Sequence, residues 1–164
     1  MRHWIFQSSP KRYRIVEAIS QVHKHDNRMV WHTQASRAPN IHIDDRVYIW
    51  VSSPIAALVG TAEVETEPDF MTEPAWEKAL WISPDSGPKP SRQVGLRIIQ
   101  ILAERIPRSA IKSNSVLAGN SFFQDRPLAI GTNFPLTLDE ATELDRMIDG
   151  CQRGGALLGT APRF

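Results

Sequence analysis

Five runs rich in apolar residues recur along this chain, and such runs are typical of β-strands. The pattern predicts strands over residues 3–7, 28–33, 47–52, 57–65 and 93–106. Within residues 57–65, small or apolar residues alternate with Thr and Glu, which indicates one buried and one solvent-facing side. Ser53 and Pro54, between the third and fourth runs, predict a hairpin.

Two segments have the period of a helix instead. The first spans residues 10–23, after a Ser and a Pro that favour a helix start. Its apolar side is formed by Tyr13, Val16, Ile19 and Val22. In the second, Thr137 and Glu140 form the sequence of a capping box, and apolar residues follow at helical spacing.

The remaining segments are irregular. Residues 66–90 are rich in Pro, Glu and Asp, and we expect a connection with one short strand at 78–82. Residues 107–120 predict a loop with a helical turn, and residues 126–130 a final strand. Strands between two helices favour an α+β fold with a strongly bent, mostly antiparallel sheet or small barrel flanked by helices. We expect one domain over residues 1–153 and a flexible tail over 154–164, which is rich in Gly and Ala.

Composition agrees with one soluble domain. The chain has 164 residues, of which 41% are hydrophobic and 23% charged, and no apolar run approaches the ~20 residues that span a bilayer. Its single cysteine, Cys151, cannot form an internal disulfide, so we expect a cytoplasmic protein and no membrane partner. The net charge of +1 counts against binding nucleic acid mainly by covering phosphates. Basic residues gather in 1–14 and 86–112, which either meet in one anion-binding face or form two separate solvated faces.

No arrangement of residues predicts catalysis. The five histidines lack metal-ligand spacing, and there is neither a cysteine pair nor an HExxH motif. A GxSxG motif and a phosphate-cradling glycine loop are also absent, and Cys151 lies on the apolar side of its predicted helix. We therefore expect no metal, no cofactor and no enzymatic activity.

Five segments, in order, resemble the EVE domain of the PUA-like superfamily, which also includes YTH and ASCH domains. The first is an aromatic strand that ends in a Ser-x-Pro turn, and the second is a Trp-centred strand followed by an arginine loop. They are residues 3–10, Trp31 to Thr33 with Arg37, residues 43–52, residues 59–64, and residues 131–137. The resemblance covers residues 3–150, and Asp44 stands where the family has Gly.

The resemblance implies a cleft between the first helix and the sheet that holds one base out of its stack. Aromatic rings would sandwich the base, and polar groups would read its edge. The implied aromatic cage is Trp31 and Trp50, although plain core packing stays open for both. The implied edge or phosphate contacts are Gln7, Ser8, Ser9, His32 and Ser52, with Asn120 and Ser121 closing the pocket from the other side. The expected contacts to the nucleic-acid backbone are Lys11, Arg12, Arg37 and Arg92.

Family members similar to this chain suggest three functions. The first is a reader of a modified base, most specifically a modified cytosine in DNA as in modification-dependent restriction, with a nuclease partner or a fused effector. The second is a small ASCH-like hydrolase of modified nucleosides. Thr33, Thr61 and Glu63 are available for it, but no Lys lies in the matching strands. The third is a PUA-like RNA-binding or partner-binding module.

Overall fold

The computed structural model describes residues 1–83, 91–124 and 131–156, with side chains described up to Arg153. The strands are β1 (His3–Ser8), β2 (Arg28–His32), β3 (Arg46–Val51), β4 (Ala57–Val64), β5 (Asp69–Phe70), β6 (Arg92–Pro107) and β7 (Asn133–Leu136). The α-helices are α1 (Ile15–Gln21), α2 (Ala75–Lys78), α3 (Arg108–Lys112) and α4 (Leu138–Ala156). Short 3₁₀ turns are η1 (Val22–His25), η2 (Ala38–Asn40) and η4 (Ser121–Phe123).

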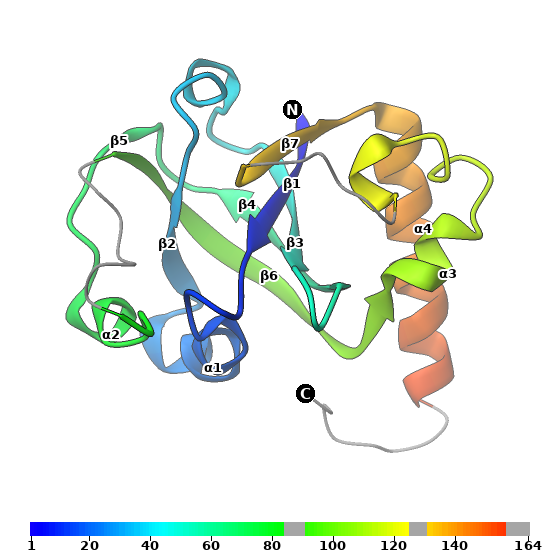
Figure 1. Ribbon diagram of the computed structural model, residues 1–164, viewed down its shortest axis with the longest axis horizontal. Helices are drawn as coiled ribbons and strands as arrows, with labels where there is room; N and C mark the ends of the chain where they lie inside the picture. Colours follow the sequence, from blue (N-terminus) through cyan, green and yellow to red (C-terminus); the bar gives the residue numbers. More distant parts are fainter. Residues whose placement is uncertain (84–90, 125–130, 157–164) are drawn as a thin grey trace.

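The strands form one curled sheet in the order β2-β6-β4-β3-β1-β7, with β5 added beside β6 (Figure 1). β1 and β3 are parallel, and every other strand pair in the described ranges is antiparallel. The register between β4 and β6 shifts twice, and such irregularities bend a strand. The predicted α+β fold with a strongly bent, mostly antiparallel sheet is therefore confirmed.

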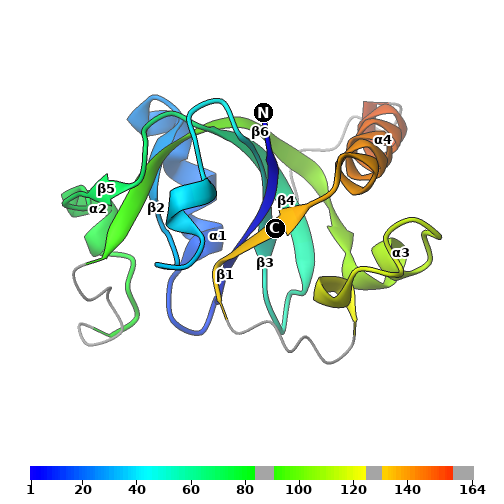
Figure 2. The ribbon, with the colours of Figure 1, turned by 90° about the horizontal axis from the view of Figure 1, so that it is seen from above.

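Each face of the sheet has its own hydrophobic core, because alternate residues of a strand point to opposite faces. Figure 2 shows the sheet curling around α1, with α3 and α4 outside the curl. Val47, Ile49 and Val51 of β3 belong to the α1-side core. Tyr48 and Trp50 of the same strand belong to the α4-side core, which includes residues of α3, η4 and α4.

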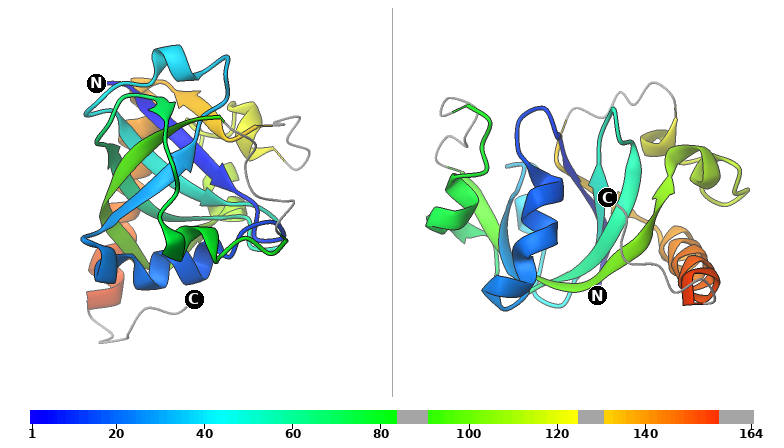
Figure 3. Two further views of the ribbon diagram at one scale, coloured as in Figure 1. Left: turned by 90° about the vertical axis from the view of Figure 1, so that its left-hand side faces the viewer. Right: turned by 90° about the horizontal axis from the view of Figure 1, so that it is seen from below.

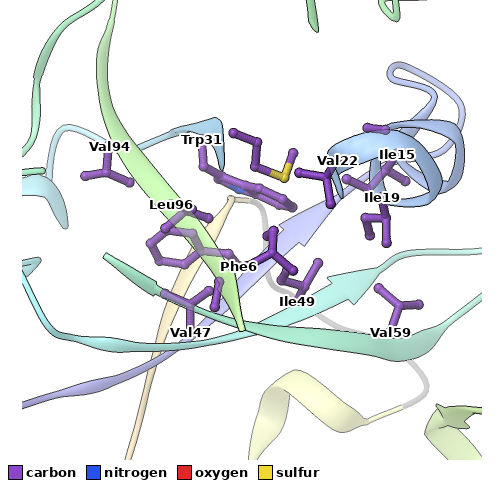
Figure 4. Packing of buried hydrophobic residues seen from close by; sticks show 14 of the residues in the cluster. Phe6, Ile15, Ile19, Val22, Trp31, Val47, Ile49, Val59, Val94 and Leu96 are labelled. Carbon is purple, nitrogen blue, oxygen red and sulfur yellow. The ribbon is translucent and has the colours of Figure 1, made fainter. Parts of the chain in front are cut away.

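The α1-side core fills the inside of the curl. Figure 4 shows Ile15, Ile19 and Val22 packing toward the strands, where they meet Phe6 and Trp31. All five side chains are nearly or fully buried. The apolar residues predicted for the first helix, Tyr13, Val16, Ile19 and Val22, all pack in or against this core.

The start of that helix differs from the prediction. α1 begins at Ile15, whereas residues 9–14 form a turn in which the Ser9 carbonyl accepts the Tyr13 N–H at 3.0 Å. Tyr13 then forms a β-bridge with Trp81, and the Arg14 N–H donates to the Leu80 carbonyl at 2.9 Å. These contacts with a distant segment hold the backbone of residues 13–14 outside a helix.

The predicted strand at residues 78–82 is also wrong. α2 occupies Ala75–Lys78, and Trp81 keeps only the isolated bridge to Tyr13. Figure 3 shows α1 and α2 side by side at one end of the sheet, and the His25 and Trp76 rings stack there at 4.1 Å between centroids. The predicted strand at 126–130 lies outside the described residues.

Several other expectations concern the turns and the ends of the chain. Asp44 has a φ of 68°, a left-handed conformation that Asp tolerates. The capping box is present, since the Glu140 carboxylate accepts the Thr137 N–H at 2.8 Å. α4 extends to Ala156, and the rest of the expected tail lies outside the described residues. Among the described helices, none is long and apolar enough to cross a membrane.

Candidate functional site

The ends of β1 and β2 and the start of β7 meet at one end of the curled sheet. Asn133, the fully buried first residue of β7, connects the two edge strands. Its Oδ1 accepts the Gln34 N–H at 2.8 Å, and its Nδ2 donates to the His32 carbonyl at 3.2 Å. A side chain thus bridges β2 and β7 where the backbone ladder is missing.

Gln7 and Gly131 shape the same corner. The Gln7 N–H donates to the Thr132 carbonyl at 2.8 Å, and Gln7 Nε2 donates to the Gly131 carbonyl at 3.1 Å. Gly131 has a φ of 150°, and a Cβ at this position would lie 2.2 Å from Nε2 of Gln34. Glycine is therefore required, and the Gln7 amide holds this turn.

His32, Glu73 and Trp81 form a hydrogen-bonded cluster beside the corner. Glu73 accepts from Trp81 Nε1 at 3.0 Å and bonds His32 Nε2 at 2.9 Å. Burial raises the pKa of the Glu73 carboxyl, but the bonds to His32 and Trp81 outweigh it, so the net pKa is below its usual value. Glu73 is therefore ionised at neutral pH and fixes both rings.

Trp81 is an aromatic surface of fixed orientation. Its ring centroid lies 4.9 Å from that of Tyr13 and 5.9 Å from that of His32. Trp81 is half-buried, so part of the indole remains accessible. A half-exposed indole anchored at its N–H is suited to stacking on a flat ligand.

A second buried carboxyl, Glu77, lies under this cluster. It is 2% exposed and accepts the Val30 N–H at 2.9 Å. Burial raises its pKa to about 8, and the charge of Glu73 adds to the rise, against the bond from Val30. Burial and then the charge of Glu77 also raise the pKa of Tyr13, whose buried hydroxyl has no partner within the described part of the chain.

The expected cage residues, Trp31 and Trp50, lie on opposite faces of the sheet. Trp31 is 5% exposed in the α1-side core, with its ring centroid 6.0 Å from that of Phe6. Trp50 is 0% exposed in the α4-side core, at 5.5 Å from Phe122 and 5.7 Å from Phe123. The sheet separates the two rings, so this arrangement does not allow them to sandwich one base.

The other expected pocket residues also lie on two different sides of the sheet. Ser8 and Ser52 lie together beside Gln7, because the Ser52 N–H donates to the Ser8 carbonyl at 2.9 Å. Asn120 instead lies on the α4 side, where it accepts the Phe122 N–H at 2.9 Å and donates to Glu140 at 3.0 Å. Ser121 follows it in η4, away from the strand ends.

Cations from both basic stretches border the His32–Trp81 cluster. Lys11 and Arg12 are exposed just after Ser9, and the Arg12 carbonyl accepts the Ile82 N–H beside Trp81. Arg92 is exposed at the start of β6, where its carbonyl accepts from Thr33. Arg37 is exposed at the other end of β1, beside a hollow described below.

The sequence alone does not point to Glu73 or Asn133, and it leaves Trp81 open as either a lid or surface packing. Asn133 could have been predicted as a site residue, because it belongs to the Gly-Thr-Asn segment that resembles the family. Glu73 and Trp81 lie in a stretch without a recognisable pattern, and only the high count of five tryptophans signalled an aromatic site. In the described ranges, no group of three or more His, Cys, Asp or Glu residues could hold a metal ion.

Solved structures share this architecture at low sequence identity. Protein Atu2648 from Agrobacterium tumefaciens is 19% identical with a TM-score of 0.64, and the alignment covers 90% of this chain and 93% of that one. Human THYN1, solved in complex with 5-methylcytosine containing DNA, is 14% identical with a TM-score of 0.63, covering 90% and 98%. The YTH domain of Zygosaccharomyces rouxii MRB1, solved with N6-methyladenosine RNA, is 8% identical with a TM-score of 0.56, covering 90% and 86%.

A search of curated proteins found no match. The family model of the EVE domain, by contrast, matches residues 2–144. The match runs from the start of β1 into α4 and includes the three strand ends, the Glu73 cluster and Asn133. This chain therefore belongs to the EVE domain family.

Proposed function

We propose that this protein reads a modified nucleobase, which it holds out of the nucleic-acid stack at the meeting point of β1, β2 and β7. The observation that carries the proposal is the half-exposed Trp81 ring, fixed by Glu73 between Tyr13 and His32. Two relatives of the same fold, solved with methylated DNA and methylated RNA, support it.

The base would stack on the Trp81 indole. Such stacking is worth about 1–3 kcal/mol per base and does not depend on the base's identity. Ser8, Ser9 and Ser52 supply hydroxyl groups for the base edge, and Ser9 is joined to this cluster by its bond to Tyr13. Trp31 lies in the core beneath the strands and would form the floor, whereas Trp50, Asn120 and Ser121 remain outside the pocket.

The ligand we propose is a modified cytosine in DNA, and the support is that human THYN1 was solved in complex with 5-methylcytosine containing DNA. Such a reader needs an effector, so we also propose a nuclease that acts in trans or is fused to this chain. We further propose that residues 1–153 belong to one domain, and that the protein works in the cytosol, where its one thiol stays reduced.

The residues available for a hydrolase are occupied or buried. The Thr33 hydroxyl donates to the Arg92 carbonyl at 2.8 Å, and Thr61 is 0% exposed. The Glu63 carboxylate pairs with Arg97 at 2.6 Å on another part of the sheet. These positions favour a binding module over an ASCH-like enzyme, and mass analysis after incubation with modified nucleosides would detect any hydrolysis.

The test is a binding panel of DNA and RNA oligonucleotides, each with one modified base, at fixed salt. We expect Trp81→Ala to weaken binding of the preferred oligonucleotide about 5- to 150-fold, the equivalent of one lost stacking contact. Trp81 is a sharper probe than Trp31, because truncating a buried Trp costs about 3–5 kcal/mol of stability on its own.

Trp76→Ala is the matched control. Trp76 is also half-buried and packs on a histidine, but it lies on α2 outside the His32–Trp81 cluster. Its loss should leave discrimination between modified and plain bases unchanged. Equal binding by the Trp81 variant and the wild type would refute the pocket, and no preference for any modified base would refute the function.

A further inference from the structure

A hollow of about 450 Å³ lies at the opposite end of β1 from the proposed base pocket. We call it the N-terminal hollow. Figure 1 shows the N-terminus, β7 and the η2 segment gathered at this end of the sheet. It is lined by Met1, Arg2, His3, Trp4, Arg37, Asn40, Pro135, Leu136 and Leu138.

The charged side chains in its lining, those of Arg2 and Arg37, are both cationic. Arg2 Nη1 donates to the backbone carbonyl and to Oδ1 of Asn40, both at 3.0 Å, so its guanidinium is positioned by uncharged acceptors. Neither Arg2 nor Arg37 forms an ion pair with a described carboxylate. Both side chains therefore keep their charge available for a ligand.

The neighbouring carboxylates are engaged elsewhere. Asp45 is 2% exposed and accepts N–H groups from the Arg2 backbone, the Trp4 indole and the His42 backbone. Glu140 accepts from Thr137 and Asn120, on the α4 side. An anion in the hollow would thus meet two arginines, and the apolar surfaces of Pro135 and Leu136 suit a sugar.

We propose that the N-terminal hollow binds a backbone phosphate of the same nucleic-acid strand that inserts its base at the other end of β1. This inference rests on the proposed function and extends it by a second contact. Phosphate contacts fix the register of a protein on its nucleic acid without reading sequence. The hollow would therefore align the strand so that one base reaches Trp81.

The strand register sets the spacing between the two contacts. β1 and β7 run through both sites, with Trp4 opposite Pro135 at the hollow and Phe6 opposite Asn133 at the pocket. The pocket residues Gln7 and Ser8 lie three and four residues beyond Trp4 of the hollow, about 10–13 Å at roughly 3.3 Å per residue. At about 3.4 Å of rise per nucleotide, that is three or four phosphates from the flipped base.

The experiment removes one phosphate charge at a time. The wild type is titrated with the preferred modified oligonucleotide, in which a single methylphosphonate replaces each phosphate in turn. We expect a loss of about 3- to 10-fold at a phosphate three or four nucleotides from the modified base. The double variant Arg2→Gln with Arg37→Gln should bind more weakly and should no longer respond to neutralisation at that position.

Two further variants complete the test. Arg37→Gln alone avoids disturbing the Arg2–Asn40 bonds and should show a partial loss of the same response. Arg105→Gln, exposed near the far end of β6, is the matched control and should respond like the wild type.

The two proposals fail in different ways. If the wild type prefers the modified base but no single phosphate near the predicted spacing matters, or if the double variant keeps the full response, the hollow does not bind the strand. If the wild type shows no preference for a modified base, the proposed function fails. Weaker binding of plain oligonucleotides by the Arg2→Gln and Arg37→Gln double variant would then still support phosphate binding in the hollow.

Discussion

Glu77 is a buried carboxyl whose ionised form is disfavoured both by burial and by the charge of Glu73. Its carboxyl is 2% exposed, its pKa is raised to about 8 by burial, and Glu73 lies close enough to raise it further. In the unfolded chain the same group titrates near 4.5. The unfolded state therefore releases its proton first as pH rises, and the folded state loses stability between about pH 4.5 and 8.

We expect Glu77→Gln to remove this pH dependence. The amide oxygen still accepts the Val30 N–H but carries no charge, so the variant should match the wild type near pH 4 and unfold at higher denaturant above pH 8. Urea unfolding at both pH values measures the difference. Glu73→Gln should instead be less stable than the wild type at neutral pH. The lowered pKa of Glu73 means that its ionised form stabilises the fold at pH values above the pKa of an unfolded glutamate. A gain for Glu77→Gln that is equal at both pH values would contradict the assignment.

At the scale of elements, the link between the end of β2 and β7 rests mainly on the Asn133 side chain, and Gln34 Oε1 adds one bond by accepting the Asn133 N–H at 3.3 Å. Asn133→Ala would leave the Gln34 N–H and the His32 carbonyl without their partner in a buried place. Each unsatisfied group costs about 1–3 kcal/mol. We expect a loss of stability in that range, faster hydrogen exchange at Gln34, and weaker oligonucleotide binding because the corner that positions His32 loosens.

Asn120→Ala should lower the stability of the fold without changing oligonucleotide binding. Asn120 also bonds a backbone N–H and a side chain, so its loss should destabilise the fold, by about 1 kcal/mol for a lost helix cap. It lies on the α4 side, however, and binding should be unchanged. If both variants bind like the wild type, the β2–β7 corner is not part of the site.

The strands could be predicted from the sequence because their alternation is local. Residues 47–52, 57–65 and 93–106 match β3, β4 and β6 within one or two residues. The start of α1 could not be predicted in this way, because it depends on the bridge from Tyr13 to Trp81, which joins segments far apart in the chain. Trp31 and Trp50 show the same limit, since alternation predicts that a strand has two faces but not which face borders the site.

Across the whole molecule, a near-neutral chain places exposed cations at both ends of β1. Lys11, Arg12 and Arg92 border the base pocket, and Arg2 and Arg37 line the N-terminal hollow. About three to five phosphate contacts are thus available, far fewer than in proteins that hold nucleic acid by charge alone. The pocket itself relies on stacking and neutral hydroxyl groups, which salt hardly screens.

Binding should therefore depend on salt only moderately, and discrimination hardly at all. We expect the logarithm of the affinity to fall with the logarithm of the salt concentration with a slope of about −3 to −4.5 on duplex DNA, and less steeply on single strands. The affinity ratio of modified to plain oligonucleotide should stay constant, because both forms release the same counterions. Titrations between low and physiological salt measure both quantities. A ratio that falls as salt rises would mean that charge contacts, rather than the Trp81 surface, distinguish the modified base.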